Sequence, residues 1–149
     1  MRYVVDQYGD SLPRKLVHSS STGAANVAAQ TGQRFDAVVT HWALANWVSD
    51  LAGFTPPPEL TYTSWHFRKT FASLNTQDPA DFGRPFPLVP TAGGGNAVNL
   101  SGTLPAGSGA YHRALQGPAG AAFTLRFSRD GTAALAASVV PRLSAIRIR

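Results

Sequence analysis

The spacing of apolar residues divides the chain near residue 76. Before that position, apolar residues recur every three to four positions, which is the spacing of amphipathic helices. After it, proline, glycine and alternating β-forming residues dominate. The pattern therefore predicts an α+β protein, with an N-terminal bundle of four or five helices followed by a small antiparallel β-sandwich that corresponds to part of a jelly roll.

The helical half carries recognisable start and stop signals. Tyr3, Val4 and Tyr8 share one face of a first helix that Gly9 ends. This helix has no N-terminal cap, so we expect the chain to be the C-terminal part of a longer protein. Four further helices are predicted: from a Ser11 cap to His18, from Ala24 to Gln30 with Gly32 behind it, from Phe35 to Leu51, and from a Ser64 cap to Leu74, with Arg68 and Lys69 facing outward.

The predicted helix 35–51 is apolar on two sides. One stripe holds Phe35, Val38, Val39, Trp42 and Ala45, and a second holds Ala37, Leu44 and Val48. A helix of this kind is a central one that packs between neighbours. Asn46 falls on the first stripe, and its amide needs a partner, for which we expect backbone from a neighbouring loop.

The pattern gives three segments along the chain. Residues 1–76 form the helical subdomain, residues 77–95 a Pro/Gly-rich connector, and residues 96–149 an antiparallel β-domain. The strand candidates in the last segment are 97–105, 109–116, 121–128, 131–140 and 143–149, with a hairpin turn at Arg129-Asp130-Gly131.

Composition narrows the class of protein. Hydrophobic residues make up 44% of the chain and charged residues only 14%, a balance more typical of secreted bacterial proteins than of cytoplasmic ones. The net charge is +5, but the basic residues are scattered, so nucleic-acid binding is not expected. The chain has no cysteine, no apolar run long enough to span a membrane and no signal peptide.

No complete active site is visible in the chain. The four histidines are not arranged as H-E-x-x-H, and the only glutamate, Glu59, follows three prolines. A Ser-His-Asp triad stays open, although no G-x-S-x-G motif supports it. His41 is interpreted as a structural histidine, with a substrate-facing or transition-state role in a cleft supplied by another segment as the alternative.

The first ninety residues or so nevertheless resemble a known family. The shared pattern is Thr22-Gly23, Asn26-Val27, Thr31-Gly32 with Phe35, Trp42-Ala43 and Ala45-Asn46, and YTSWHFRKTFASL followed by PFPLVP. It resembles the segment C-terminal to the zinc helix in secreted bacterial metallopeptidases of the hyicolysin family. The family's zinc-binding H-E-x-x-H helix is absent and Glu59 does not match its glutamate ligand, so no catalytic residue and no metal ligand can be carried over.

The resemblance implies the non-catalytic C-terminal portion of a secreted zinc metallopeptidase, in which the helices support one wall of the substrate cleft and the β-domain is an accessory. Its partners would be the upstream catalytic segment or a peptide substrate, and its zinc would be held outside this chain. It predicts an exposed apolar face on the first helix. The alternative is a stand-alone extracellular module that binds protein or polysaccharide through Tyr111, His112 and Arg113. A third interpretation, an enzyme of unknown type, requires a pocket in which His41 or His66 meets an aspartate.

Overall fold

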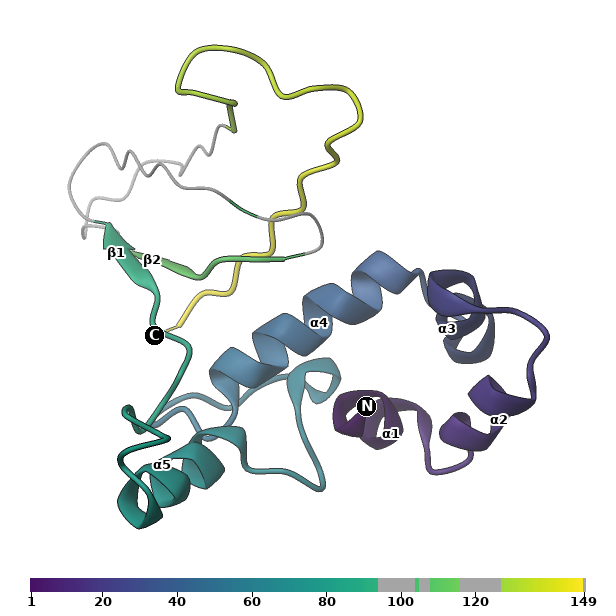
Figure 1. The fold of residues 1–149 in the computed structure, drawn as a ribbon, viewed down its shortest axis with the longest axis horizontal. Coiled ribbons are helices and arrows are strands. Elements are labelled where there is room, and N and C mark those ends of the chain that lie inside the picture. The colour runs from purple at the N-terminus through teal and green to yellow at the C-terminus, as the bar shows by residue number, and fades with distance from the viewer. Residues whose placement is uncertain (94–103, 105–107, 116–126, 149) are drawn as a thin grey trace. The chain divides into compact units, whose positions relative to one another are not determined.

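A computed structural model of the chain describes residues 1–93, 104, 108–115 and 127–148. The chain divides into two compact units, one of Met1–Pro87 with Leu143–Arg149 and one of Leu88–Arg142. Helices make up the first unit, and the described part of the second holds one pair of short strands (Figure 1).

The helical expectation is confirmed. Five α-helices and one 3-10 turn form in chain order, and Gly32 closes the third helix in the left-handed conformation, with φ 68°. The elements are α1 (Arg2–Tyr8), α2 (Leu12–His18), α3 (Gly23–Thr31), α4 (Phe35–Val48), η1 (Pro58–Leu60) and α5 (Phe67–Gln77).

Helix α4 is the central element of the helical unit. It contacts α1, α3, α5 and η1, and it runs through the middle of this unit in Figure 1. Val38 and Ala45 from its first stripe are buried together with Tyr3 of α1. Phe35 and Trp42 on the same stripe are instead 42% and 46% exposed, so the stripe is covered along the edge that holds Val38 and Ala45 and open beside it.

Asn46 finds a different partner from the one expected. It is buried on α4, and its Oδ1 accepts a hydrogen bond from the hydroxyl of Tyr62 rather than from loop backbone. Tyr62 also packs edge-on against Tyr3, with ring centroids 5.9 Å apart. One polar contact therefore ties the loop after η1 to the core.

Helix α1 is held by polar contacts to residues far along the chain. The Tyr3 hydroxyl donates to the backbone oxygen of Glu59 at 2.8 Å, and the Gln7 amide donates to that of Thr61 at 2.8 Å. Burial raises the pKa of the Tyr3 phenol above its ordinary value. Tyr3 is 2% exposed, so the apolar face of α1 is covered by the described residues rather than open as the family resemblance predicts.

The predicted Ser64 cap of the last helix is wrong. Ser64 instead forms hydrogen bonds with Asp6 of α1. The Oδ1 of Asp6 accepts from the Ser64 hydroxyl at 2.7 Å, and its Oδ2 accepts from the Thr63 and Ser64 backbone N–H groups. Helix α5 begins three residues later, at Phe67, and its first amides are capped from the end of α4. Ser49 Oγ accepts from the Phe67 N–H at 2.9 Å.

An aromatic cluster joins α4, α5 and the segment after α5. Phe86 packs on Trp47 and Phe67, with centroids 5.6 and 6.0 Å away. Arg68, which was expected to face outward, lies over the Phe86 ring at 3.7 Å and donates to the Trp47 backbone oxygen. The aromatic rings therefore draw the guanidinium inward through cation–π contact.

The described residues of the second half do not form a sandwich. The strands β1 (Thr91–Gly93) and β2 (His112–Ala114) pair in parallel, with Thr91 opposite His112. Residues 131–140 and 143–148 alternate as predicted strands do but form none, because alternation marks two faces without supplying a partner strand. The strand candidates 97–105 and 121–128 fall almost wholly outside the described residues.

The predicted turn at 129–131 does form, and the described residues on either side of it, 127–128 and 132–140, belong to no strand. The Arg129 N–H donates to the Ala133 backbone oxygen at 2.9 Å, and Asp130 Oδ1 accepts from the N–H groups of Thr132 and Ala133. Gly131 adopts a φ of 98°, which a side chain would oppose. The local turn chemistry was therefore predictable while the hairpin was not.

Candidate functional site

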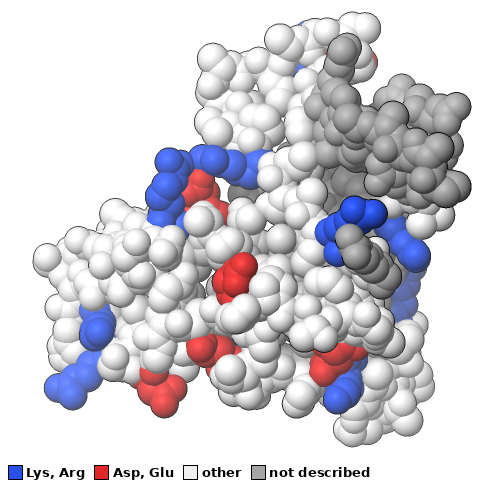
Figure 2. Space-filling view, turned by 180° about the vertical axis from the view of Figure 1, so that it is seen from behind, with Lys and Arg blue, Asp and Glu red and all other residues white. Residues whose placement is uncertain are grey.

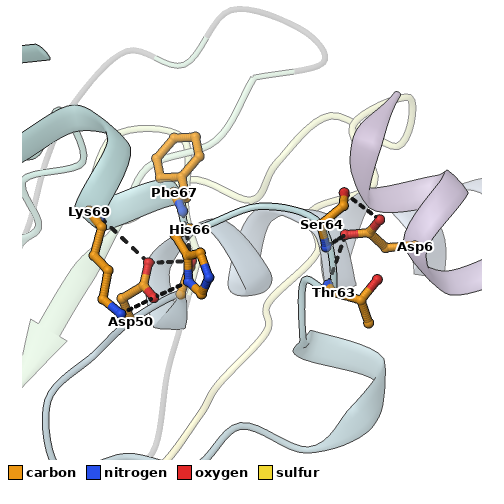
Figure 3. Close-up of polar contacts among 8 residues, drawn as sticks. Asp6, Asp50, Thr63, Ser64, His66, Phe67 and Lys69 are labelled. Atoms are coloured by element: carbon orange, nitrogen blue, oxygen red, sulfur yellow. Dashed lines mark hydrogen bonds and ion pairs between the residues drawn. The ribbon is translucent and has the colours of Figure 1, made fainter. Parts of the chain in front are cut away.

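The structure brings His66 and an aspartate together. Nδ1 of His66 lies 2.7 Å from Oδ1 of Asp50, and Figure 3 shows the imidazole and the carboxylate facing each other between the end of α4 and the start of α5. The Asp50 side chain is only 10% exposed, whereas that of His66 is 68% exposed. A buried carboxylate therefore orients an imidazole that solvent can reach.

Local backbone geometry explains why Asp50 reaches this place. Helix α4 ends at Val48, and the chain turns with Asp50 at a φ of 54°. Aspartate is one of the few residues other than glycine that adopt this left-handed region readily. The turn aims the carboxylate at the start of α5, where it also accepts from the Ser49 hydroxyl at 3.2 Å.

The hydrogen bonds around Asp50 keep its carboxylate charged. Burial raises the pKa of Asp50, but hydrogen bonds from the His66 side chain, the Lys69 backbone and the Ser49 hydroxyl outweigh it and lower that pKa below its usual range. Because an ionised carboxylate only accepts, Nδ1 of His66 carries the proton that is donated to Asp50. The ring nitrogen left for a ligand is Nε2.

The arrangement differs from a Ser-His-Asp triad. The nearby hydroxyl, that of Ser49, donates to Asp50 and accepts from the Phe67 N–H. It bonds to the carboxylate and not to the imidazole, so His66 does not activate it as a nucleophile. The pair can exchange a proton, or a hydrogen bond, with a group that another molecule brings to Nε2.

Positive charge surrounds the pair. The Lys69 ammonium lies 3.7 Å from Oδ1 of Asp50 and is 72% exposed. The Asp50 charge also acts on Arg68, whose guanidinium has a pKa that burial lowers and Asp50 raises in part. Two cations and one ionisable imidazole thus accompany a single carboxylate.

The hollow described in the helical unit lies apart from this pair. It is lined by residues of α5 and of the segment behind it: Phe71, Asp81, Phe82, Gly83, Arg84 and Pro87. The third interpretation required a pocket where a histidine meets an aspartate. The aspartate is present at His66, but neither His66 nor Asp50 lines this hollow.

The other candidate residues lie in two places. His41 is half-buried on α4 and makes no hydrogen bond or ion pair within the described ranges. Tyr111 precedes β2 and is half-buried, and burial raises the pKa of its phenol. His112 and Arg113 are exposed on β2 itself. The structure thus keeps Tyr111, His112 and Arg113 adjacent in the second unit, while His41 and His66 belong to the helical unit.

Sequence reasoning named His66 but missed Asp50. The two residues are 16 positions apart and joined by a proline-containing loop, so no spacing rule connects them. The available signal was an aspartate directly after a predicted helix, opposite a histidine directly before the next one. The predicted helix ran on to Leu51, which hid that aspartate in its last turn.

Most of the face of the molecule drawn in Figure 2 carries neither basic nor acidic side chains. Within the described part of the chain, no helix combines the length and the apolar character that crossing a membrane requires, and no three His, Asp or Glu side chains gather as metal ligands. Comparison with family models, with curated proteins and with solved structures finds no match to this chain.

Proposed function

We propose that this chain is the non-catalytic C-terminal portion of a secreted zinc metallopeptidase-like protein, with the helical unit as one wall of the substrate cleft. The observation that carries the proposal is the Asp50–His66 pair. The ends of α4 and α5 present an oriented imidazole, the nearby Ser49 hydroxyl is bonded to Asp50 and not to that imidazole, and the hollow lined by Phe71 and Phe82 does not include it. Such a group serves chemistry whose remaining parts come from elsewhere. Because the apolar face of α1 is covered, the catalytic segment of this proposal would pack on another part of the helical unit.

The framework around the pair supports a positioning role. Asp50 follows α4, His66 precedes α5, and the aromatic cluster beneath them fixes how the two helices meet. Sites held by helices keep their geometry better than sites on free loops. In this proposal His66 contacts a peptide that lies between this wall and the catalytic segment, and the β half is an accessory module.

The zinc that the resemblance implies does not fit the described residues of this chain. A zinc site takes three or four protein ligands, and no three such side chains gather among the described residues, where Asp50 and His66 form a pair. The proposal therefore leaves the metal, and every step that it performs, to residues outside this chain.

The proposal is tested first at the gene. Translation of the DNA upstream of the Met1 codon, in the same frame, is expected to contain H-E-x-x-H within about two hundred residues, the scale of a further domain. A stop codon and a ribosome-binding site directly before Met1 would overturn it. In the joined protein, His66→Ala is expected to raise KM about three- to fivefold with kcat unchanged, because an exposed contact to the peptide is lost and no catalytic group is removed.

A second candidate function is a stand-alone extracellular module that binds protein or polysaccharide. Its supporting observation is the row Tyr111, His112 and Arg113, in which His112 and Arg113 are exposed on β2. Aromatic and arginine side chains side by side are common in binding surfaces. Binding that is lost in Tyr111→Ala and unchanged in His66→Ala would favour this candidate over the first.

A further inference from the structure

We propose that Asp50, His66 and Lys69 form a binding site for the carboxylate of a peptide, hereafter the carboxylate site. The proposal rests on the proposed function only in naming a peptide as the source of the carboxylate. The geometry rests on two described side chains, those of His66 and Lys69, around one carboxylate oxygen of Asp50 (Figure 3).

The two donors of the site lie side by side. His66 Nδ1 and Lys69 Nζ approach the same oxygen of Asp50, at 2.7 and 3.7 Å. Both side chains are about two-thirds exposed or more, at 68% and 72%. The imidazole and the ammonium are therefore each accessible to a ligand from solvent.

Asp50 orients these donors without competing for the ligand. Its carboxylate is 10% exposed and also accepts from the Ser49 hydroxyl and the Lys69 N–H. The first amides of α5 are likewise occupied, because the Phe67 N–H donates to Ser49. The side chains of His66 and Lys69, rather than the helix start, are what a ligand meets.

Charge selects an anion over a metal ion. Nε2 of a neutral imidazole could ligate a metal, but Lys69 stands beside it and Arg68 lies close enough to be influenced by Asp50. These two positive charges repel a cation and attract an anion. A carboxylate fits because its oxygens are acceptors that suit the donors exposed here, an imidazole N–H and the Lys69 ammonium.

The test is a titration of the whole chain in mildly acidic buffer, followed by NMR of the His and Lys side chains. Four probes are used: an N-acetylated alanine tripeptide with a free C-terminus, the same peptide amidated, an amidated peptide with one glutamate, and inorganic phosphate. Saturable shifts of His66 and Lys69 with the two carboxylate peptides, and none with the amidated alanine peptide, are expected. Equal binding of the amidated peptide or of phosphate would overturn the proposal.

The chain supplies a matched control pair. Lys15 and His18 of α2 are also exposed and three residues apart, but no carboxylate is described between them. His66→Gln and Lys69→Met are each expected to weaken peptide binding about three- to fivefold, the effect of an exposed charged contact. His18→Gln and Lys15→Met are expected to leave peptide binding unchanged. Equal losses in both pairs would show that general surface charge attracts the peptide, and would overturn the proposal.

Asp50→Asn separates an oriented site from a merely basic surface. Asparagine also adopts the left-handed backbone, so the turn is retained. If charge alone attracted the ligand, removing the negative charge would tighten binding. If Asp50 holds the imidazole in place, binding weakens, which is the result expected. Tighter binding would overturn the proposal. The upstream translation is independent of all these titrations, so the two proposals can fail separately.

Discussion

At the scale of single residues, Asp6 shows how one side chain fastens two distant segments. Its carboxylate accepts three hydrogen bonds from Thr63 and Ser64. Although burial raises the pKa of Asp6, these hydrogen bonds outweigh it and lower that pKa below its ordinary value. A carboxyl whose pKa is depressed by folding contributes stability above its ordinary pKa, and that stability is lost as the pH falls through the lowered value.

We therefore expect Asp6→Asn to lower the free energy of unfolding near neutral pH by about 1–2 kcal/mol, since hydrogen bonds to a charged acceptor are lost. The measurement is urea unfolding followed by circular dichroism, repeated from neutral to strongly acid pH. The difference between variant and parent should shrink toward the acid end. Asp10→Asn, at a nearby exposed residue, is the control and should behave like the parent. A constant difference at all pH values would contradict the role of the Asp6 charge.

At the scale of elements, the N-terminal cap of α5 shows a difference between the residue that the local sequence predicts and the residue that caps the helix in the structure. Ser64 had the residue type and the position for a cap, yet Ser49 accepts the Phe67 N–H from 18 residues away. Ser49→Ala is expected to cost about 1 kcal/mol, as lost caps do, and to speed hydrogen exchange at the first amides of α5. Ser64→Ala should leave those amides protected. Faster exchange at these amides in Ser64→Ala alone would show that Ser64, and not Ser49, caps the helix.

The same contrast explains which parts of the fold the sequence could predict. Helices α1 to α4 follow apolar spacing and turn residues such as Gly32, which act over a few positions. The site could not be predicted this way, because Asp50 and His66 meet only once the loop between them has folded. The strand predicted from the alternation in residues 131–140 does not form for a similar reason, since a strand depends on a partner that its own sequence does not specify.

At the scale of the whole molecule, the core of the helical unit consists of packed side chains and not of a ligand cluster. No three potential ligand side chains gather among the described residues, and the helical core is formed by residues such as Tyr3, Val38 and Ala45. Dialysis against EDTA is therefore expected to leave the Tm unchanged within about 1 °C, because folding free energy is not linked to metal binding. Differential scanning calorimetry before and after dialysis checks this. A Tm lowered by several degrees and restored by zinc would instead assign a metal site to this chain.

The long-range fastening of α1 has a consequence during synthesis. The partners of Tyr3, Gln7 and Asp6 lie 56, 54 and 58 residues further along the chain. At about 5–20 residues per second, the ribosome needs roughly 3–12 s to deliver them. A helix of seven residues is too short to persist alone in water. The rate of translation therefore sets how long α1 waits as an unformed segment, and codon usage between residues 9 and 64 is a lever on when the helical unit closes.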